Sequence, residues 1–487
     1  MSYLSLPFIA FVLLVIFAYY ILPKKYRWGA LLCASVAFCA MFDLRYLLFL
    51  LFTALSTFLT ARFLHKFRRK YVVVSFCVVV NVAVWFYIKE LPWVLRTLSR
   101  VLIKFGIDYS VPELSLLVPV GISYFTLQAI AYLIDVTKGK IAAERHFGKY
   151  LLFLSWFPAI VQGPISRYGQ LQPQLMNNNK FSYDKMRAGM VLVLFGLVKK
   201  LVIADRIGIF VNCCFENYRQ LEGITLYLGA IGYAIQLYTD FSGCVDICRG
   251  VSSLFGVDMV DNFNRPYLAC SIKEFWSRWH ISLSSWLKDY VYIGLGGNRK
   301  GKIRKCFNIL VTFLVSGLWH GAGFHFFAWG CLHAVYQIVG TATMPIKRLT
   351  KRIIGLQEGS LSERVYQIFI TFHLVAFGWI VFRAGGFENA LVYIACMFSE
   401  VEPWVLMDGS LFTHGISQNA FTVLVSNIVA LIAVECRFKK QEDSVAALLN
   451  THLILRWAIY IVLIFDVLLF GVYGRGYDIG GFLYGGF

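Results

Sequence analysis

Long apolar stretches, separated by short polar or basic segments, run through most of the chain. Residues 4–22, 71–88, 365–382 and 454–472 are four of them. Each has about the length that an α-helix needs to cross the ~30 Å hydrocarbon core of a bilayer. The pattern therefore predicts an all-α polytopic membrane protein. We expect about eleven spanning helices and additional re-entrant or interfacial helices.

Helix-breaking and charged residues interrupt some of these stretches. Residues 111–136 contain two prolines and a glycine, which indicates a kinked or re-entrant helix enclosed by other protein. Residues 188–204 contain Lys199 and Lys200. We expect both ammonium groups to snorkel to a membrane interface along their aliphatic stems.

Basic loops give the orientation of the first spans. The loops 23–27 and 62–70 are rich in Lys and Arg, whereas the loop 43–45 between them is weakly charged. Because Lys and Arg concentrate in cytoplasmic loops, we expect both basic loops in the cytoplasm and the N-terminus outside. The chain is thus predicted to be a multi-pass protein of the cytoplasmic (inner) membrane.

Composition agrees with a membrane protein and excludes other classes. Hydrophobic residues make up 59% of the 487 residues and charged residues only 15%, against about 25% charged in soluble domains. The net charge of +19 fits loops that face anionic lipid. No finger or basic arm indicates a nucleic-acid partner. The twelve cysteines form no Cys-x-x-Cys pair, so no metal site is expected. We expect residues 1–487 to form a single membrane-embedded domain.

The stretch 273–336 differs from the rest because polar residues interrupt its aromatic sequence. Residues 274–287 have helical periodicity, which predicts one helix with Trp276, His280 and Ser284 on one face. This helix is too polar to cross lipid alone. We therefore expect it to lie at the interface or to line an interior funnel.

Two of the nine histidines, His280 and His320, are each bracketed by tryptophan and small polar residues. Desolvation keeps an imidazole neutral, and a neutral imidazole can act as a general base. A loop and an ascending helix over 307–319 can bring the two together. His373, alone in an apolar span, is expected to be a core histidine with satisfied hydrogen bonds. From these residues alone, acyl transfer, proton transfer and transport all remain open.

Several ordered sequence blocks resemble the membrane-bound O-acyltransferase (MBOAT) family. They most closely resemble its bacterial branch, which O-acetylates alginate and other exopolysaccharides. The matching blocks are 119–128 (PVGISYFTLQ), 157–164 (FPAIVQGP), 196–205 (GLVKKLVIAD), 238–243 (YTDFSG), 261–267 (DNFNRPY), 275–299, 317–321 (GLWHG), 378–383 (GWIVFR) and 474–477 (GRGY).

The resemblance implies a fold and a site. The fold would be a ring of tilted helices around a central tunnel, with a catalytic core at about 112–340. His320 would be the catalytic base, and His280 would hydrogen-bond the acyl carbonyl or the developing oxyanion. The residues expected to contact substrate or line the tunnel are Trp319, Trp276, Arg278, Ser284, Asp289, Asn298, Arg299 and Asp240.

The resemblance also implies a reaction. An acyl group, expected to be acetyl, would pass from a cytoplasmic thioester across the membrane to a hydroxyl of an extracytoplasmic polysaccharide. The donor would be acetyl-CoA or an acyl carrier, with no bound cofactor. A secreted or anchored acyltransferase could be a partner. Alternatives are D-alanyl transfer for teichoic-acid modification, a histidine-containing transporter, and a non-catalytic scaffold.

Overall fold

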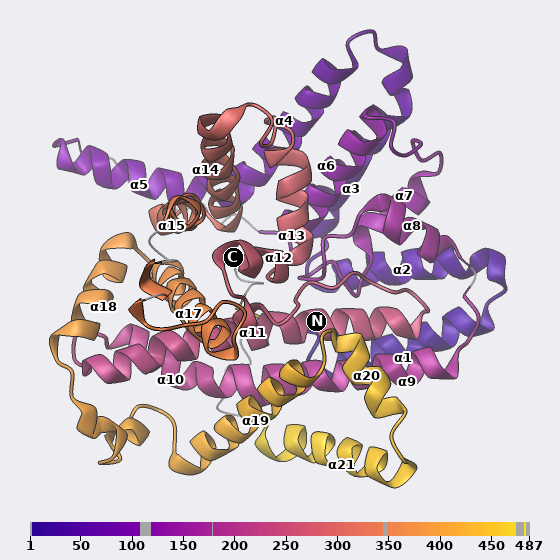
Figure 1. Cartoon of the computed structure of the whole chain (residues 1–487). Helices are drawn as coiled ribbons and strands as arrows, with labels where there is room; N and C mark the ends of the chain where they lie inside the picture. The colour runs from indigo at the N-terminus through magenta and orange to yellow at the C-terminus, as the bar shows by residue number, and fades with distance from the viewer. Residues whose placement is uncertain are drawn as a thin grey trace. The chain divides into compact units, whose positions relative to one another are not determined.

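Every regular element in the described part of the chain is a helix, and no strand occurs there (Figure 1). The computed structural model describes residues 2–107, 118–177, 179–343, 349–351, 353–473 and 482–483. The all-α prediction is confirmed. Two features used in the sequence analysis lie outside the described residues: Pro112, the first proline of 111–136, and the block 474–477.

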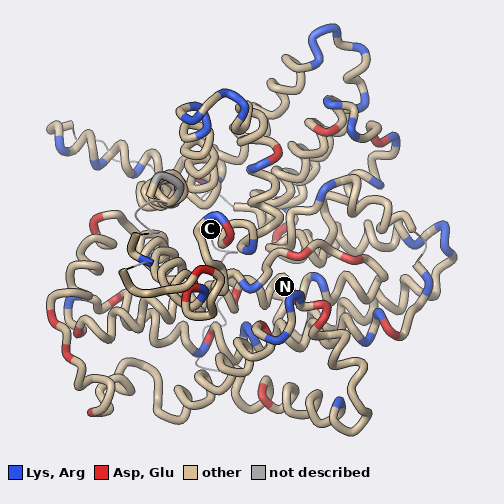
Figure 2. Tube along the Cα trace, viewed as in Figure 1, with Lys and Arg blue, Asp and Glu red and all other residues tan. Residues whose placement is uncertain are grey.

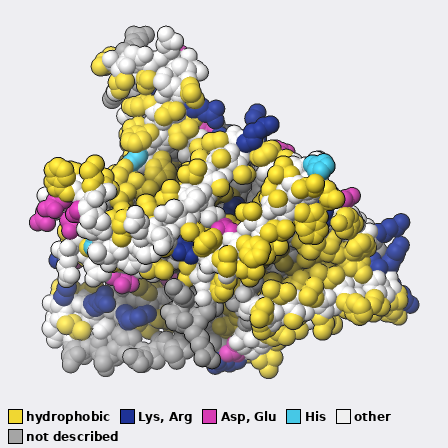
Figure 3. Space-filling model, turned by 90° about the horizontal axis from the view of Figure 1, so that it is seen from below, with side chains coloured by type: hydrophobic (Ala, Val, Ile, Leu, Met, Phe, Trp, Pro, Cys, Tyr) yellow, Lys and Arg dark blue, Asp and Glu magenta, His cyan; other side chains and the backbone are white. Residues whose placement is uncertain are grey.

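Five described helices are long and apolar enough to cross a membrane. They are Tyr46–Lys66, Lys70–Lys89, Leu361–Arg383, Gln418–Arg437 and Leu453–Phe470. In the last two helices, only 6% of the most apolar 18-residue segment is buried inside the protein. Their exposed apolar side chains therefore require an apolar solvent. Figure 3 shows one face of the molecule on which hydrophobic side chains predominate. These features confirm a multi-pass membrane protein.

The chain forms two compact units, which are described separately. Unit 1 comprises Met1–Val193, Cys244–Val260 and Tyr484–Phe487, and unit 2 comprises Leu194–Gly243 and Asp261–Leu483. The single domain expected for 1–487 stays a prediction.

Unit 1 contains the N-terminal helices. Its α3 packs on α6 and α7, and α2 also packs on α7. The hydroxyl groups of Thr57 on α3 and Tyr150 on α7 are hydrogen-bonded at 2.8 Å. The helices are α1 (Leu6–Ile21), α2 (Arg27–Ala40), α3 (Tyr46–Phe63), α4 (Lys70–Lys89), α5 (Leu91–Lys104), α6 (Ile122–Thr137), α7 (Phe147–Ser155), α8 (Tyr168–Met176) and most of α9 (Tyr183–Leu197).

Unit 2 contains the stretch that the sequence singles out, and its α14 and α15 form a closely packed antiparallel pair. The helices are η3 (Val198–Ala204), α10 (Asp205–Glu216), most of α11 (Gly223–Leu254), η4 (Pro266–Leu268), α12 (Ile272–Arg278), α13 (Ile281–Trp286), η5 (Leu287–Tyr292), α14 (Gly301–His320), α15 (Phe324–Ala342), α17 (Leu361–Arg383), α18 (Phe387–Ser399), η6 (Pro403–Leu406), η7 (Ser410–Thr413), α19 (Gln418–Arg437), α20 (Gln441–Leu449) and α21 (Leu453–Phe470).

Glycines allow α14 and α15 to approach closely. A Cβ atom at Gly317 would lie 2.4 Å from the carbonyl oxygen of Phe326, and one at Gly330 would lie 2.6 Å from that of Phe313. Neither contact leaves room for a side chain, so both positions need glycine. This approach places the end of α14, where His320 lies, against the first turns of α15.

The prediction of one continuous helix over 274–287 is wrong. The helix ends at Arg278 and restarts at Ile281, because a neighbouring segment takes over the hydrogen bonds at the break. The backbone N–H of Asn264 donates to the carbonyl of Arg278 at 2.9 Å. The N–H of Ile281 donates to the carbonyl of Asn262 at 2.9 Å. Trp276, His280 and Ser284 therefore do not share one helix face.

The prediction that Lys200 snorkels to an interface is also wrong. Its side chain is buried, and Nζ lies 2.7 Å from carboxylate oxygens of both Asp205 and Asp240. The π-helical turn η3 carries this lysine. The backbone N–H of Leu483, near the end of the chain, donates to Asp240 Oδ2 at 2.9 Å. Buried charges of opposite sign replace the expected contact with water.

Candidate functional site

His320 is the last residue of α14, and its buried side chain is surrounded by aromatic rings. Its ring centroid lies 5.4 Å from that of Trp329 on α15 and 5.2 Å from that of Phe382 on α17. Both rings meet the imidazole edge to face. These surroundings exclude bulk water from the ring.

His280 lies at the break between α12 and α13, where its backbone has a left-handed φ of 43°. Only 1% of the residue is exposed. Its ring packs edge to face on Phe241 of α11, with the centroids 4.8 Å apart. Non-glycine residues rarely adopt this backbone conformation, so the surrounding structure must hold it in place.

The hydrogen bonds of Asn262 determine the tautomer of His280. Asn262 Oδ1 accepts from the backbone N–H of Ser282 at 3.0 Å and from the Ser282 hydroxyl at 2.8 Å. A backbone N–H can only donate, so the Asn262 atom that it contacts must be the oxygen. His280 Nδ1, 3.2 Å from the same oxygen, therefore carries the proton. In neutral His280, Nε2 is then a proton acceptor.

Burial also determines the charge of His280. The residue lies outside the five helices that are long and apolar enough to cross a membrane. Desolvation lowers its pKa to about 3. The imidazole is consequently neutral near pH 7, with Nε2 able to accept a proton or a hydrogen bond.

Trp319 connects the two histidines. Its ring centroid lies 5.9 Å from that of His280 and 4.9 Å from that of His320. The structure thus places both imidazoles against one indole, although 40 positions (320 − 280) separate them in the sequence. The result is a buried site with two imidazoles and largely aromatic walls.

Trp276 contacts His333, to which the sequence analysis assigned no role. The Trp276 indole N–H donates to His333 Nδ1 at 3.3 Å. His333 is fully buried on α15, one turn after the Trp329 that packs on His320. The signal that could have identified it is the four-residue spacing from Trp329, which puts both residues on one helix face.

Three further candidate residues, Arg278, Ser284 and Asp240, make structural contacts around the site. Arg278 forms an ion pair with Glu274 at 2.5 Å, and its Nη1 donates to the carbonyl of Arg265 at 3.3 Å. Ser284 Oγ donates to the carbonyl of Trp279 at 3.1 Å, across the helix break. Asp240 belongs to the ion pair with Lys200, and its neighbour Phe241 is the residue that contacts His280.

The remaining candidates lie at the other end of α14. Asp289 belongs to the π-helical turn η5, and Asn298 and Arg299 are exposed in the loop before α14. Asn298 and Arg299 help to line a pocket of about 320 Å³. These three residues are therefore not grouped with the two imidazoles.

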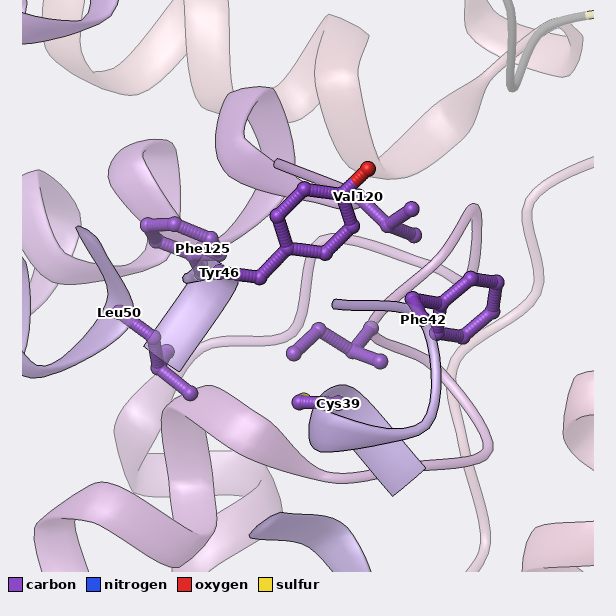
Figure 4. A pocket seen from close by; sticks show the side chains of 7 residues that line it. Cys39, Phe42, Tyr46, Leu50, Val120 and Phe125 are labelled. Atoms are coloured by element: carbon purple, nitrogen blue, oxygen red, sulfur yellow. The ribbon is translucent and has the colours of Figure 1, made fainter. Parts of the chain in front are cut away.

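A second cavity, in unit 1, is too small for a substrate. Figure 4 shows its mostly apolar lining, with Phe42, Tyr46, Leu50 and Phe125 around it. Its volume of about 10 Å³ is at the lower limit for a single water molecule. Among the described residues, no group of three or more His, Cys, Asp or Glu side chains is arranged to hold a metal ion.

Comparison with known proteins gives consistent matches. Residues 142–377 match the model of MBOAT, the membrane-bound O-acyltransferase family. The chain is 34% identical over 389 residues to the Probable alginate O-acetylase AlgI of Pseudomonas aeruginosa, covering 78% of this chain and 71% of that protein. It is 31% identical over 396 residues to the Peptidoglycan O-acetyltransferase of Helicobacter pylori, covering 74% and 72%.

A more distant relative carries out a different transfer. The Teichoic acid D-alanyltransferase of Bacillus subtilis is 28% identical over 290 residues, covering 57% of this chain and 72% of that protein. Both acetylating relatives are thus more similar to this chain, and over a larger part of it.

Proposed function

Because the chain belongs to the membrane-bound O-acyltransferase family and is an O-acyltransferase, we propose that it moves an acetyl group from a cytoplasmic thioester to a hydroxyl of an extracytoplasmic polysaccharide. The acetyl donor is supported by the greater similarity to the two O-acetylating relatives than to the D-alanyltransferase. We place the enzyme in the cytoplasmic membrane, where a thioester and a polysaccharide have access from opposite sides. The polysaccharide accepts the group directly or through a partner acyltransferase.

His320 is the general base of the proposed reaction. It takes the proton of the acceptor hydroxyl as that oxygen attacks the thioester carbonyl carbon. The tetrahedral intermediate then collapses, the C–S bond breaks, and His320 returns the proton to the departing thiolate. Such general acid–base catalysis contributes about 10²–10⁴-fold to the rate.

His280 has a different role from the one the resemblance implies. A neutral His280 that donates from Nδ1 to Asn262 has no second N–H to donate to an oxyanion. We assign to its Nε2 a hydrogen bond from a second hydroxyl of the acceptor, which orients the attacking oxygen toward the carbonyl carbon. His280 is thus an acceptor in the site, and His320 removes the proton.

The observation that supports this function best is the contact of both imidazoles with Trp319 in aromatic surroundings. Water that reached the site would hydrolyse the thioester instead of transferring its acyl group. Aromatic walls around His320 limit that side reaction.

Reconstituted protein tests the proposal. Proteoliposomes would receive [¹⁴C]acetyl-CoA outside and an alginate or peptidoglycan oligosaccharide inside, with a D-alanyl carrier protein as the competing donor. We expect acetyl transfer that requires the intact His320. Transfer of D-alanine alone would assign the chain to the teichoic-acid type. Acetylation that persists in His320→Ala would contradict the assignment of His320 as the general base, whereas no transfer at all by the purified wild type would point to a scaffold for another enzyme.

A further inference from the structure

A cluster of three buried charges in unit 2 includes Asp240, the residue that precedes Phe241. Figure 2 shows that long parts of the helices carry no Lys, Arg, Asp or Glu, so such a cluster stands out. Lys200 Nζ lies 2.7 Å from carboxylate oxygens of Asp205 on α10 and Asp240 on α11. Asp240 and Lys200 are both buried. Two carboxylates and one ammonium leave the cluster with a formal charge of −1 (1 − 2).

A segment late in the chain, Phe482–Leu483, completes this cluster. Lys200 donates to Oδ1 of Asp240, and the backbone N–H of Leu483 donates to Oδ2 at 2.9 Å. The buried Phe482 ring lies over the lysine, with Nζ 5.0 Å from the ring centroid. A hydrogen bond to a buried carboxylate and a cation–π contact each offset part of the cost of removing charges from water. The segment therefore supplies contacts that the three charges cannot supply to one another.

The chain after α21 meets the same region at a second point. The backbone N–H of Val472 donates to the carbonyl of Leu201 at 3.0 Å. Leu201 belongs to η3, the π-helical turn that also carries Lys200. Arg206, in the first turn of α10, donates to the carbonyl of Phe470. The contact of Phe482 and Leu483 with the cluster is thus part of a wider contact with η3 and α10.

Phe241 connects the cluster to His280. It follows Asp240 on α11 and is fully buried. Successive side chains of an α-helix point about 100° apart, so Asp240 faces the cluster while Phe241 faces the site. The Phe241 ring centroid lies 4.8 Å from that of His280 and 5.0 Å from that of Phe263. The contacts of Asp240 therefore fix the rotation of α11 at this point, and with it the position of the Phe241 ring.

His280 needs such support from its surroundings. Its φ of 43° is unfavourable for a residue other than glycine and persists only where neighbouring groups hold it. The hydrogen bond between Nδ1 and Asn262 Oδ1, at 3.2 Å, leaves the ring able to tilt about that contact. The rings of Phe241 and Trp319 pack edge to face on the imidazole and limit the tilt. The direction in which Nε2 points thus depends on where the Phe241 ring lies.

We propose that Phe482 and Leu483 are positioning residues of the acyl-transfer site. By completing the charge cluster they fix Asp240, hold Phe241 against His280 and so direct Nε2 toward the acceptor polysaccharide. They act through Phe241 and not by contact with substrate. This inference rests on the proposed function, because it relates the contact to acyl transfer. A purely structural contact would stabilise the fold and leave His280 where it is.

Proline and alanine at position 483 separate the backbone contact from the side chain. Leu483→Pro removes the N–H that donates to Asp240, whereas Leu483→Ala keeps it and shortens only the side chain. In protein that carries histidine labelled with ¹³C at Cε1, the NMR signal of His280 is the one missing from His280→Asn. We expect Leu483→Pro to shift this signal, because the ring current of Phe241 moves with its ring. Leu483→Ala should leave the signal in place, and neither variant should move the signals of the other eight histidines (9 − 1).

Turnover in proteoliposomes provides the second measurement. Misplacement of a reacting group by about 1 Å can cost about 10²-fold in rate. We expect Leu483→Pro to lower kcat/KM for the acceptor by about 10–10²-fold per folded enzyme and to leave KM for the thioester unchanged. In the His280→Asn background the same proline should cost less than about twofold, because the residue through which it acts has been replaced.

The outcomes separate positioning from structural support. An unshifted His280 signal in Leu483→Pro would overturn the proposal. An equal loss of turnover from the proline with and without His280 would indicate purely structural support and also overturn it. If Leu483→Pro does not fold, Phe482→Leu removes only the ring over Lys200 and should shift the same signal. A shifted signal in a wild-type background that transfers no acetyl group would leave the positioning of His280 standing, and the proposed function would fail.

Discussion

The imidazole of His333 lies directly over Gly378 at the contact between α15 and α17. A Cβ atom at position 378 would be 2.8 Å from His333 Nε2 and 3.4 Å from Cε1. His333 has no room to retreat, because Trp276, Trp329 and Trp379 all pack on its ring. Gly378 therefore allows α17 to approach the aromatic residues around the site.

Replacing Gly378 with alanine should displace His333 and reduce both stability and activity. Overpacking a filled interior costs about 1–3 kcal/mol, and the displaced ring contacts Trp329, which packs on His320. Thermal unfolding in detergent and an acetyl-transfer assay measure the two effects. Gly29→Ala on α2 is the control, because nothing lies within 4 Å of its added methyl group. Equal melting temperatures for both variants would contradict the close contact.

His320→Ala should abolish acyl transfer and leave the fold intact. A general base contributes about 10²–10⁴-fold to the rate, so the loss should be at least of this size. The control is His373→Ala on α17, whose ring nitrogens contact the Tyr227 hydroxyl at 2.6 Å and the Phe369 carbonyl at 2.8 Å. We expect His373→Ala to lower the melting temperature with little change in turnover. The assignment fails if His320→Ala turns over at a near-normal rate.

His280 should make the stability of the folded protein depend on pH. Its folded pKa of about 3 lies below the ordinary value of 6.5, so the unfolded chain binds a proton that the folded chain does not. The contribution of neutral His280 is complete above pH 6.5. It is lost progressively as the pH falls from 6.5 toward 3, by up to about 1.4 kcal/mol per pH unit.

Unfolding of the wild type and of His280→Asn between pH 7 and pH 4 measures this contribution. Other titrating groups affect both proteins alike, so the difference between them isolates residue 280. We expect His280→Asn to lose less stability on acidification than the wild type. Parallel pH profiles would show that residue 280 titrates as an exposed histidine does.

Lys200→Met should destabilise the fold strongly, because it leaves Asp205 and Asp240 without their shared cation. Breaking a buried pair from one side costs about 3–5 kcal/mol. An added Asp240→Asn substitution should recover part of the loss. Lys185→Met, which breaks the exposed pair with Asp258, should cost less than about 1 kcal/mol. Similar losses in the two lysine variants would contradict the buried cluster.

Lys24 and Lys66 should face the cytoplasm. They lie in η1 (Lys24–Tyr26) and η2 (Leu64–Lys66), the short turns that follow α1 and α3. A cysteine at either site should not react with an impermeant maleimide added to intact cells, and it should react after the membrane is permeabilised. Labelling in intact cells would reverse the predicted orientation.

The sequence predicts those features whose signal lies within a single segment. Each spanning helix carries its own apolar run, so the all-α membrane fold could be predicted. His280 and His320 were identifiable because each lies beside tryptophans in a polar-interrupted stretch. The helix break at His280 could not be predicted, because it depends on backbone hydrogen bonds with Asn262, which accepts, and Asn264, which donates. The burial of Lys200 likewise depends on Asp240, forty positions later.

His333 illustrates a second limit of the sequence. It lies in an apolar helical run, where a single histidine looks like any other core residue. What distinguishes His333 is its hydrogen bond with the Trp276 indole, 57 positions earlier, and its close contact with Gly378 on another helix. Both contacts exist only after α12, α15 and α17 have packed together.

The left-handed backbone at His280 restricts which amino acids can replace it during evolution. Apart from glycine, the residues that adopt this conformation most readily are asparagine, aspartate and histidine. Three of these four carry a group that accepts hydrogen bonds. Valine, isoleucine and other β-branched residues would be strained at this positive φ, even if the surrounding space could hold their side chains. The backbone conformation thus limits which substitutions are tolerated, and most of the tolerated residues keep a hydrogen-bonding group at position 280.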